Sequence, residues 1–238
     1  MSDFATPKTK AVLVLLTSIA FAISPVFTAP FTGFDPAFFT TTLERPPVQP
    51  AGYAFSIWGL IYIWLIAAAV FGWLKRREDA GWDATRLPLL VSTGIGATWI
   101  AVANTSPIAA TLLIFAMLIT ALMALFRAPV SDKYWLRAPL GLYAGWLSAA
   151  SFVSLATILA GYGIFSREAA GWLGLLGALA VAVTLANNLR APGYGIAVIW
   201  ALIGIIVAQW QSDTLLAGAA AGGAVAVLTY TLRPRAAA

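Results

Sequence analysis

Eight long apolar runs, separated by short polar segments, constrain the fold of this chain more than any other feature of its sequence. A helix needs about 20 mostly apolar residues to cross the hydrocarbon core of a bilayer, and in lipid the backbone must satisfy its own hydrogen bonds. Only 10% of the 238 residues are charged, too few to cover a water-soluble domain of this size. We therefore predict an all-α fold, a polytopic transmembrane helical bundle of about eight spans. The expected spans are residues 11–28, 51–74, 87–104, 107–126, 139–161, 169–189, 192–210 and 214–232.

The positions of the basic residues test the number of spans, because Lys and Arg concentrate on the cytoplasmic side of membrane proteins. With eight spans and a cytoplasmic N-terminus, all 14 basic residues except Arg45 and Arg167 fall on that side. One span more or fewer would send the later charges to the other side, so the distribution favours an even number and two cytoplasmic termini. Seven spans with one re-entrant segment are the alternative. The expected cytoplasmic residues are Lys8, Lys10, Lys75, Arg76, Arg77, Arg86, Arg127, Lys133, Arg137, Arg190, Arg233 and Arg235.

The residue types that carry most enzyme and metal chemistry are missing. The sequence has no Cys and no His, which excludes disulfides, thiolate and imidazole metal ligands and His-based catalytic triads. The carboxylates lie in tails, loops and span ends, whereas ion-coupled transporters and proton relays need them within spans. We therefore expect no enzyme, no metal site and no obligatory cofactor. Nucleic acid is not expected as a partner either, because the basic residues are accounted for as anchors at span ends.

The first span and the loop that follows it each allow two interpretations. Lys8 and Lys10 before an apolar run are also typical of a signal peptide, but the length of the run, Pro25 within it and the lack of a cleavage site favour a span. The loop 29–50 is rich in phenylalanine. We expect it either to pack over the external end of the bundle as a lid or to lie in the lipid interface.

Small residues recur at spacings of three or four along the fifth, sixth and eighth spans. Such rows let helix backbones approach closely in lipid. We expect them to serve packing within the chain, and a homodimer interface is the alternative. The rows are Gly141, Gly145 and Ala149, then Gly171, Gly174 and Gly177, then Gly218 and Gly222.

Aromatic side chains at helical spacing mark one face of the second span and one face of the fifth. An indole N–H in hydrocarbon needs an acceptor, and two aromatic faces can enclose a flat apolar ligand by stacking. Plain core packing is the alternative, and the spacing alone favours it. The residues are Phe55, Trp58 and Tyr62 in the second span and Tyr143, Trp146, Ala150 and Val153 in the fifth.

The same residues resemble the motifs of the tryptophan-rich sensory protein family, also called the translocator protein family (TspO/MBR). The family's second span follows a double proline and carries a tryptophan and a tyrosine four residues apart, and its fifth span opens on a proline, a tyrosine and a tryptophan. This chain departs from the pattern in lacking the proline inside the second-span motif and in having Ser154 where the family has asparagine. The matching residues are Pro46, Pro47, Trp58, Ile61 and Tyr62, and then Pro139, Tyr143, Trp146 and Ala150.

The resemblance implies a five-helix core over residues 1–162 and a three-helix extension over residues 163–238. It implies a sensory or binding protein of a bacterial inner membrane, without enzymatic activity, for a flat apolar ligand such as a porphyrin or other tetrapyrrole. Family members often form homodimers, so a homodimer is an expected partner besides the lipid bilayer and the small molecule. By position, Trp58, Tyr62, Tyr143 and Trp146 would line the pocket, and the loop with Pro46 and Pro47 would close it.

Two other functions fit the same sequence. Eight spans could form a passive transporter or channel for apolar or small neutral solutes, and the glycine rows could make the chain a scaffold subunit of a membrane complex.

Overall fold

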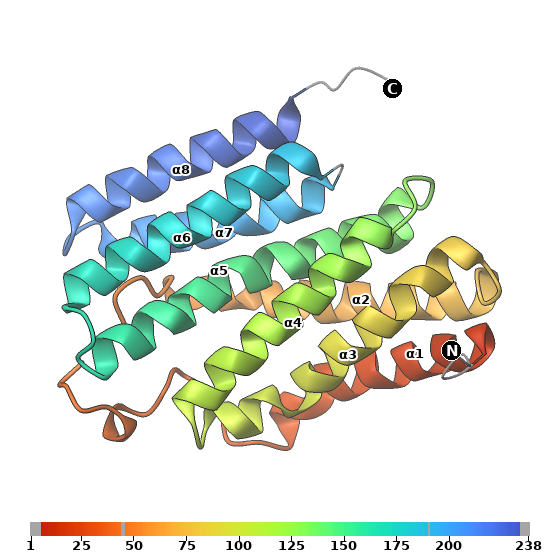
Figure 1. The fold of residues 1–238 in the computed structure, drawn as a ribbon, viewed down its shortest axis with the longest axis horizontal. Helices are drawn as coiled ribbons and strands as arrows, with labels where there is room; N and C mark the ends of the chain where they lie inside the picture. The colour runs from red at the N-terminus through yellow and green to blue at the C-terminus, as the bar shows by residue number, and fades with distance from the viewer. Residues whose placement is uncertain (1–5, 44–45, 190, 234–238) are drawn as a thin grey trace.

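The computed structural model describes residues 6–43, 46–189 and 191–233, which form helices joined by short turns and one long loop (Figure 1). Eight of the helices are long and apolar enough to cross a membrane, which confirms the predicted all-α bundle. They are α1 Pro7–Ile23, α2 Ile57–Lys75, α3 Ala80–Ala103, α4 Pro107–Arg127, α5 Ala138–Gly161, α6 Arg167–Asn188, α7 Pro192–Gln209 and α8 Thr214–Leu232. Three short 3-10 turns, η1 Ser24–Val26, η2 Pro36–Phe38 and η3 Gly52–Ser56, and one π-helical turn, η4 Lys133–Arg137, complete the order.

Most helices begin where the sequence supplies a cap. A side-chain oxygen just before the helix accepts a hydrogen bond from a backbone N–H of the first turn, which satisfies a donor that has no partner inside the helix. Proline at a first helical position costs no hydrogen bond, because its N–H would be unpaired there. The side-chain caps are Thr6 of α1, Asp79 of α3, Ser106 of α4, Ser166 of α6 and Asp213 of α8, and the first-position prolines are Pro7, Pro107 and Pro192.

Two helices begin more than four residues away from the start that hydropathy predicts. The third helix begins at Ala80 instead of residue 87, because Asp79 caps it and accepts a hydrogen bond from the Trp82 backbone N–H at 2.9 Å. The charged residues of its first turns are paired with neighbours, so the helix tolerates them. The second helix becomes α-helical only at Ile57, since the residues before it form the 3-10 turn η3.

The fifth helix, α5, lies at the centre of the bundle (Figure 1). It packs against α2 and α4 on one side and against α6 and α7 on the other. Around it, α1 packs on α2 and α3, and α8 packs on α6 and α7. Every residue from 139 to 149 is buried, which no other helix matches over such a length in the described chain. The bundle therefore depends on α5 for contact between its first four and its last three helices.

Glycines bring α5 and α7 into backbone contact. A Cβ added to Gly145 would clash with the Tyr194 carbonyl oxygen, and one added to Gly193 would stand 2.6 Å from the Ala138 carbonyl oxygen. By contrast, an added Cβ at Gly218 or at Gly222 of α8 would meet nothing within 4 Å. The row on α5 thus serves packing within the chain, while the row on α8 faces outward.

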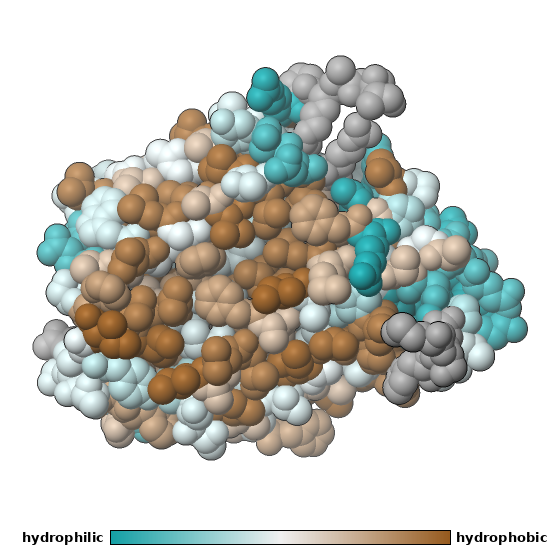
Figure 2. Space-filling view, viewed as in Figure 1, coloured by the Kyte–Doolittle hydropathy of each residue, from teal (hydrophilic) through white to brown (hydrophobic). Residues whose placement is uncertain are grey.

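The two ends of the bundle differ in charge. The space-filling view shows apolar side chains over its middle and hydrophilic side chains gathered at the right, where α1 begins and α2 joins α3 (Figure 2). We call this the basic end and the opposite one, which holds the loop 29–50, the loop end. Of the basic residues that the structure describes, Arg167 alone starts a helix at the loop end. Arg45, Arg190 and Arg235 lie outside the described residues.

We expect Gly145→Ala to lower the free energy of unfolding by about 1–3 kcal/mol, because its methyl group must push α7 away from α5. Thermal unfolding in detergent measures this. Gly222→Ala is the matched control: it should leave the melting temperature unchanged or raise it slightly, since its methyl group meets open space. Equal effects of the two substitutions would contradict the close approach of α5 and α7.

Candidate functional site

Aromatic side chains from α1, α2 and α5 meet inside the bundle. The Trp58 and Tyr62 rings are stacked, with centroids 5.4 Å apart. The Trp58 ring also lies 6.4 Å from that of Tyr143 and 6.2 Å from that of Trp146. We call this group the aromatic cluster; its members are Phe21, Phe55, Trp58, Tyr62, Tyr143 and Trp146.

The structure brings together most of the residues that the sequence singled out. Phe55 approaches Trp146 edge-on at 5.8 Å, so the predicted faces of α2 and α5 do face each other. Ala150, one turn beyond Trp146, is half-buried and packs on the same core. Pro46 and Pro47 belong instead to the loop described below. The role of these residues in binding a ligand stays a prediction.

Sequence reasoning missed Phe21, the member of the cluster that α1 contributes. Its ring lies edge-on to Trp58 at 5.6 Å and to Tyr62 at 5.0 Å, and it is buried. Phe21 also lies against Gly96 of α3, where an added Cβ would stand 2.7 Å from the ring. A single phenylalanine in an apolar span carries no motif, and only the tertiary contact reveals it.

Two small cavities lie inside the bundle, away from the aromatic cluster. Each has a volume of about 20 Å³, room for about one water molecule. One lies between α5, α6 and α7 beside Val48, and the other lies between α1, α2 and α3. Neither cavity has room for a ligand much larger than a water molecule.

One fully buried polar atom in the cluster has no hydrogen-bond partner among the described residues. The Trp146 side chain is 2% exposed, and its indole Nε1–H donates to no acceptor among the described residues. A buried donor left unpaired costs about 1–3 kcal/mol. Tyr143 beside it is satisfied, because its hydroxyl shares a 2.9 Å hydrogen bond with Ser92, which itself donates to the Met117 carbonyl. A ligand with a hydrogen-bond acceptor would therefore gain most by placing that acceptor at the Trp146 N–H.

Three other tryptophans donate their indole N–H to backbone carbonyls. Trp64 donates to the Tyr134 carbonyl at 3.0 Å, Trp99 to the Ala110 carbonyl at 2.9 Å, and Trp200 to the Ala54 carbonyl at 2.8 Å. Each lies nearer the surface than Trp146 and still has a backbone acceptor. Among the described residues, Trp82 and Trp146 are the two fully buried tryptophans; Trp82 donates to Asp132, whereas Trp146 has no acceptor.

A second unpaired atom lies on α1. Ser18 Oγ is buried without a hydrogen-bond partner among the described residues. Ser18 stands three residues before Phe21, so it shares the helix face that enters the aromatic cluster. Both unpaired buried side-chain atoms thus belong to helix faces that carry members of the cluster.

The loop 29–50 packs over the ends of several helices, which is the first of the two arrangements expected for it. The Phe31 ring lies edge-on to Trp99 of α3 at 5.1 Å. Further along, the backbone N–H groups of Thr40 and Thr41 both donate to the Gly161 carbonyl at 3.0 Å, at the end of α5.

The last part of the loop is held by α6 and α7. Gln209 donates to the Pro47 carbonyl at 2.9 Å. Gly171 of α6 leaves room for Pro47, because an added Cβ would stand 3.3 Å from that proline's Cβ. The Ala51 N–H then donates to the Gly204 carbonyl at 2.9 Å, just before the 3-10 turn that carries Phe55. Helices α6 and α7 therefore position the segment that leads into the aromatic cluster.

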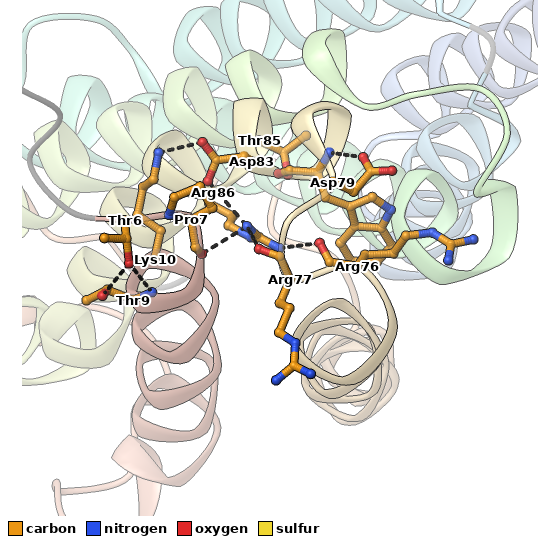
Figure 3. A network of polar contacts seen from close by, with 11 residues as sticks. Thr6, Pro7, Thr9, Lys10, Arg76, Arg77, Asp79, Asp83, Thr85 and Arg86 are labelled. Atoms are coloured by element: carbon orange, nitrogen blue, oxygen red, sulfur yellow. Dashed lines mark hydrogen bonds and ion pairs between the residues drawn. The ribbon is translucent and has the colours of Figure 1, made fainter.

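The charged residues at the edges of the spans serve structural contacts at the basic end. Arg86 of α3 is 3% exposed and points between the start of α1 and the end of α2 (Figure 3). Its guanidinium donates to the Pro7, Arg77 and Arg76 carbonyls, at 3.0, 2.8 and 2.7 Å. Asp83 pairs with both Arg86 and Lys10. Arg86 thus ties α1, the end of α2 and α3 together.

Asp132, in the α4–α5 connection, joins three elements at the same end. One of its carboxylate oxygens accepts from the Trp82 indole at 2.7 Å and from Arg76 Nε at 3.1 Å. Partial burial alone would raise the pKa of Asp132, but these two hydrogen bonds and the charge of Arg76 outweigh it and hold the pKa below its ordinary value. Among the described residues, no group of three or more Asp, Glu, His or Cys side chains could hold a metal ion.

We expect Asp132→Asn to destabilise the protein at pH 7, because it removes the charge that Arg76 faces. A carboxyl group whose pKa is lowered by folding stabilises above its ordinary pKa, about 4, and loses that contribution as the pH falls through the folded value. The difference in melting temperature between the two proteins should therefore be complete at pH 7 and shrink below about pH 4. A difference that stays constant down to pH 3 would contradict the ion pair.

One protein-family model, described as TSPO-like protein, matches residues 10–233. The match runs through all eight helices and includes every residue that the sequence predicted for the site. No curated protein matches the chain, and no solved structure does.

Proposed function

The chain belongs to the TSPO-like protein family, and on that premise we propose that it is a non-enzymatic membrane protein that binds a flat apolar ligand at the aromatic cluster. A porphyrin or another tetrapyrrole is the ligand we propose. Sensing or binding is the function that the family suggests, and the aromatic cluster is the place where the chain offers stacking surfaces to such a molecule.

The observation that carries the proposal is the unpaired Trp146 indole N–H among stacked and edge-on rings. A flat ligand that enters between Trp58 and Trp146 would replace ring–ring contacts with its own π faces. If it brings an acceptor, such as a ring nitrogen or a carboxylate, that atom would take the hydrogen bond that the protein leaves unmade. This hydrogen bond would form without breaking one that the protein already makes, because the Trp146 N–H has no protein partner.

Phe55 marks the entry side in this proposal. It is 38% exposed, it leans on Trp146, and it sits in the turn η3 directly after the loop 29–50. Movement of η3 would uncover Trp146 without disturbing the start of α5. Pro46 and Pro47 then act at a distance, as the part of the loop that α6 and α7 hold in place.

Each part of the chain has a role in this proposal. Residues 1–162 would supply the ligand site, and residues 163–238 would anchor the loop that closes it. An enzymatic role is not part of the proposal, because the carboxylate of α3, Asp83, is engaged in structural ion pairs with Lys10 and Arg86. We place the basic end, with both termini, in the cytoplasm and the protein in a bacterial inner membrane.

We expect Trp146→Phe to weaken protoporphyrin binding about tenfold or more, because it keeps an aromatic ring but removes the N–H that the ligand's acceptor needs. The shift of the porphyrin absorption band during titration of the purified protein measures the affinity, so the number of remaining tryptophans does not matter.

Trp73→Phe is the matched control, since Trp73 lies 40% exposed near the end of α2 and outside the aromatic cluster. It should leave the affinity unchanged. A wild-type affinity in Trp146→Phe, or an equal loss in both variants, would show that the ligand binds elsewhere.

A further inference from the structure

The connections at the basic end contain more basic side chains than the acidic ones neutralise. Lys8 pairs with Glu78, Lys10 and Arg86 pair with Asp83, and Arg76 pairs with Asp132. The remaining acid of this region, Asp79, accepts the Trp82 backbone N–H as a helix cap. Among the described residues of these connections, the exposed basic side chains left without an ion pair are Lys75, Arg77, Arg127 and Lys133.

Two of these cations flank an aromatic stack. Phe71 of α2 and Trp135 of η4 lie nearly parallel, with an interplanar angle of 5° and centroids 4.7 Å apart. Lys75 follows Phe71 by four residues and therefore lies on the same side of α2. Lys133 stands two residues before Trp135 in η4. We call Phe71, Lys75, Lys133, Tyr134 and Trp135 the aromatic–basic shelf.

The shelf is exposed at the ends of two helices that are long and apolar enough to cross a membrane. Tyr134 is 76% exposed and Trp135 is 46% exposed, although both adjoin membrane-crossing helices. Beside them, Leu74 at the end of α2 is 55% exposed. Tyrosine and tryptophan are favoured at the membrane–water interface, where the ring lies in an apolar layer and its polar group reaches the headgroups.

The shelf is also held in place before any ligand arrives. Trp64 of α2 donates to the Tyr134 carbonyl at 3.0 Å, and Asp132 is bonded to Arg76 and Trp82. On its other side, Arg137 donates to the Ala128 carbonyl at 2.6 Å. A preorganised surface loses little conformational entropy when it binds.

From these contacts we infer that the aromatic–basic shelf is a binding site for the headgroup of an anionic phospholipid. Lys75 and Lys133 would contact the phosphate as two strongly hydrated point charges, and the outer face of Trp135 would cover the glycerol and the start of an acyl chain. A zwitterionic lipid would bind less well, because its own cation would face the unpaired basic side chains. The inference does not depend on the proposed tetrapyrrole site.

The test counts bound lipids by native mass spectrometry of the full-length protein in a neutral detergent, during titration with phosphatidylglycerol or phosphatidylcholine. The wild-type protein should bind phosphatidylglycerol more tightly. Each of Lys75→Gln and Lys133→Gln should weaken that binding roughly fivefold, and together they should bring it to the level of phosphatidylcholine. Both lysines are exposed and unpaired, so the variants should keep the wild-type melting temperature in phosphatidylcholine nanodiscs.

Arg233→Gln is the matched control, because it removes one exposed charge at the basic end outside the shelf. It should retain the preference for phosphatidylglycerol. Equal binding of the two lipids by the wild-type protein would overturn the inference, and so would an equal loss in Arg233→Gln and Lys133→Gln. Displacement of phosphatidylglycerol by millimolar inorganic phosphate would also overturn it, because that result would indicate a site for a free anion.

Discussion

The close approach of α5 to its neighbours is the contact on which the other features of the bundle depend. In lipid, helices are held by van der Waals contact and hydrogen bonds more than by the hydrophobic effect. Gly145 allows α7 to approach the α5 backbone at Tyr194, and the Tyr194 hydroxyl then shares a 2.9 Å hydrogen bond with Ser148. The same stretch of α5 directs Tyr143 and Trp146 toward α2. One helix therefore connects the last three helices to the aromatic cluster.

The loop 29–50 links the two halves a second time. Its last residues lie against Gly171 and Gly204 and accept a hydrogen bond from Gln209 before the chain enters η3 and α2. Movement of Phe55, which leans on Trp146, is thus connected to contacts with α6 and α7. These contacts of the loop with α6 and α7 would determine how readily the aromatic cluster opens.

Much of the fold could be predicted from the sequence, because apolar runs, caps and charges act locally. Ser106 with Pro107 and Asp213 with Thr214 mark helix starts that the structure confirms within one residue. The early start of α3 could not be read from hydropathy, since it depends on the partners of Asp83 and Arg86 in other segments. The division into residues 1–162 and 163–238 stays a prediction, and the family match runs through both parts.

The candidate site could be predicted only in part, because some of its contacts join segments that are far apart in the sequence. Helical spacing places Trp58 with Tyr62 and Tyr143 with Trp146, and the structure brings the two pairs together. Phe21 joins them through tertiary packing alone. The lack of a partner for the Trp146 N–H is likewise invisible in a sequence, because it depends on which carbonyls the neighbouring helices leave within reach.

A structure of the protein with bound protoporphyrin is the most direct test of the account. It should show the macrocycle between the Trp58 and Trp146 rings, with an acceptor about 3 Å from Trp146 Nε1. Phe55 should have moved away from its present contact with Trp146. A porphyrin bound on the lipid-facing surface or between α6 and α7, with the rings of the aromatic cluster unchanged and the Trp146 N–H still unpaired, would contradict the account.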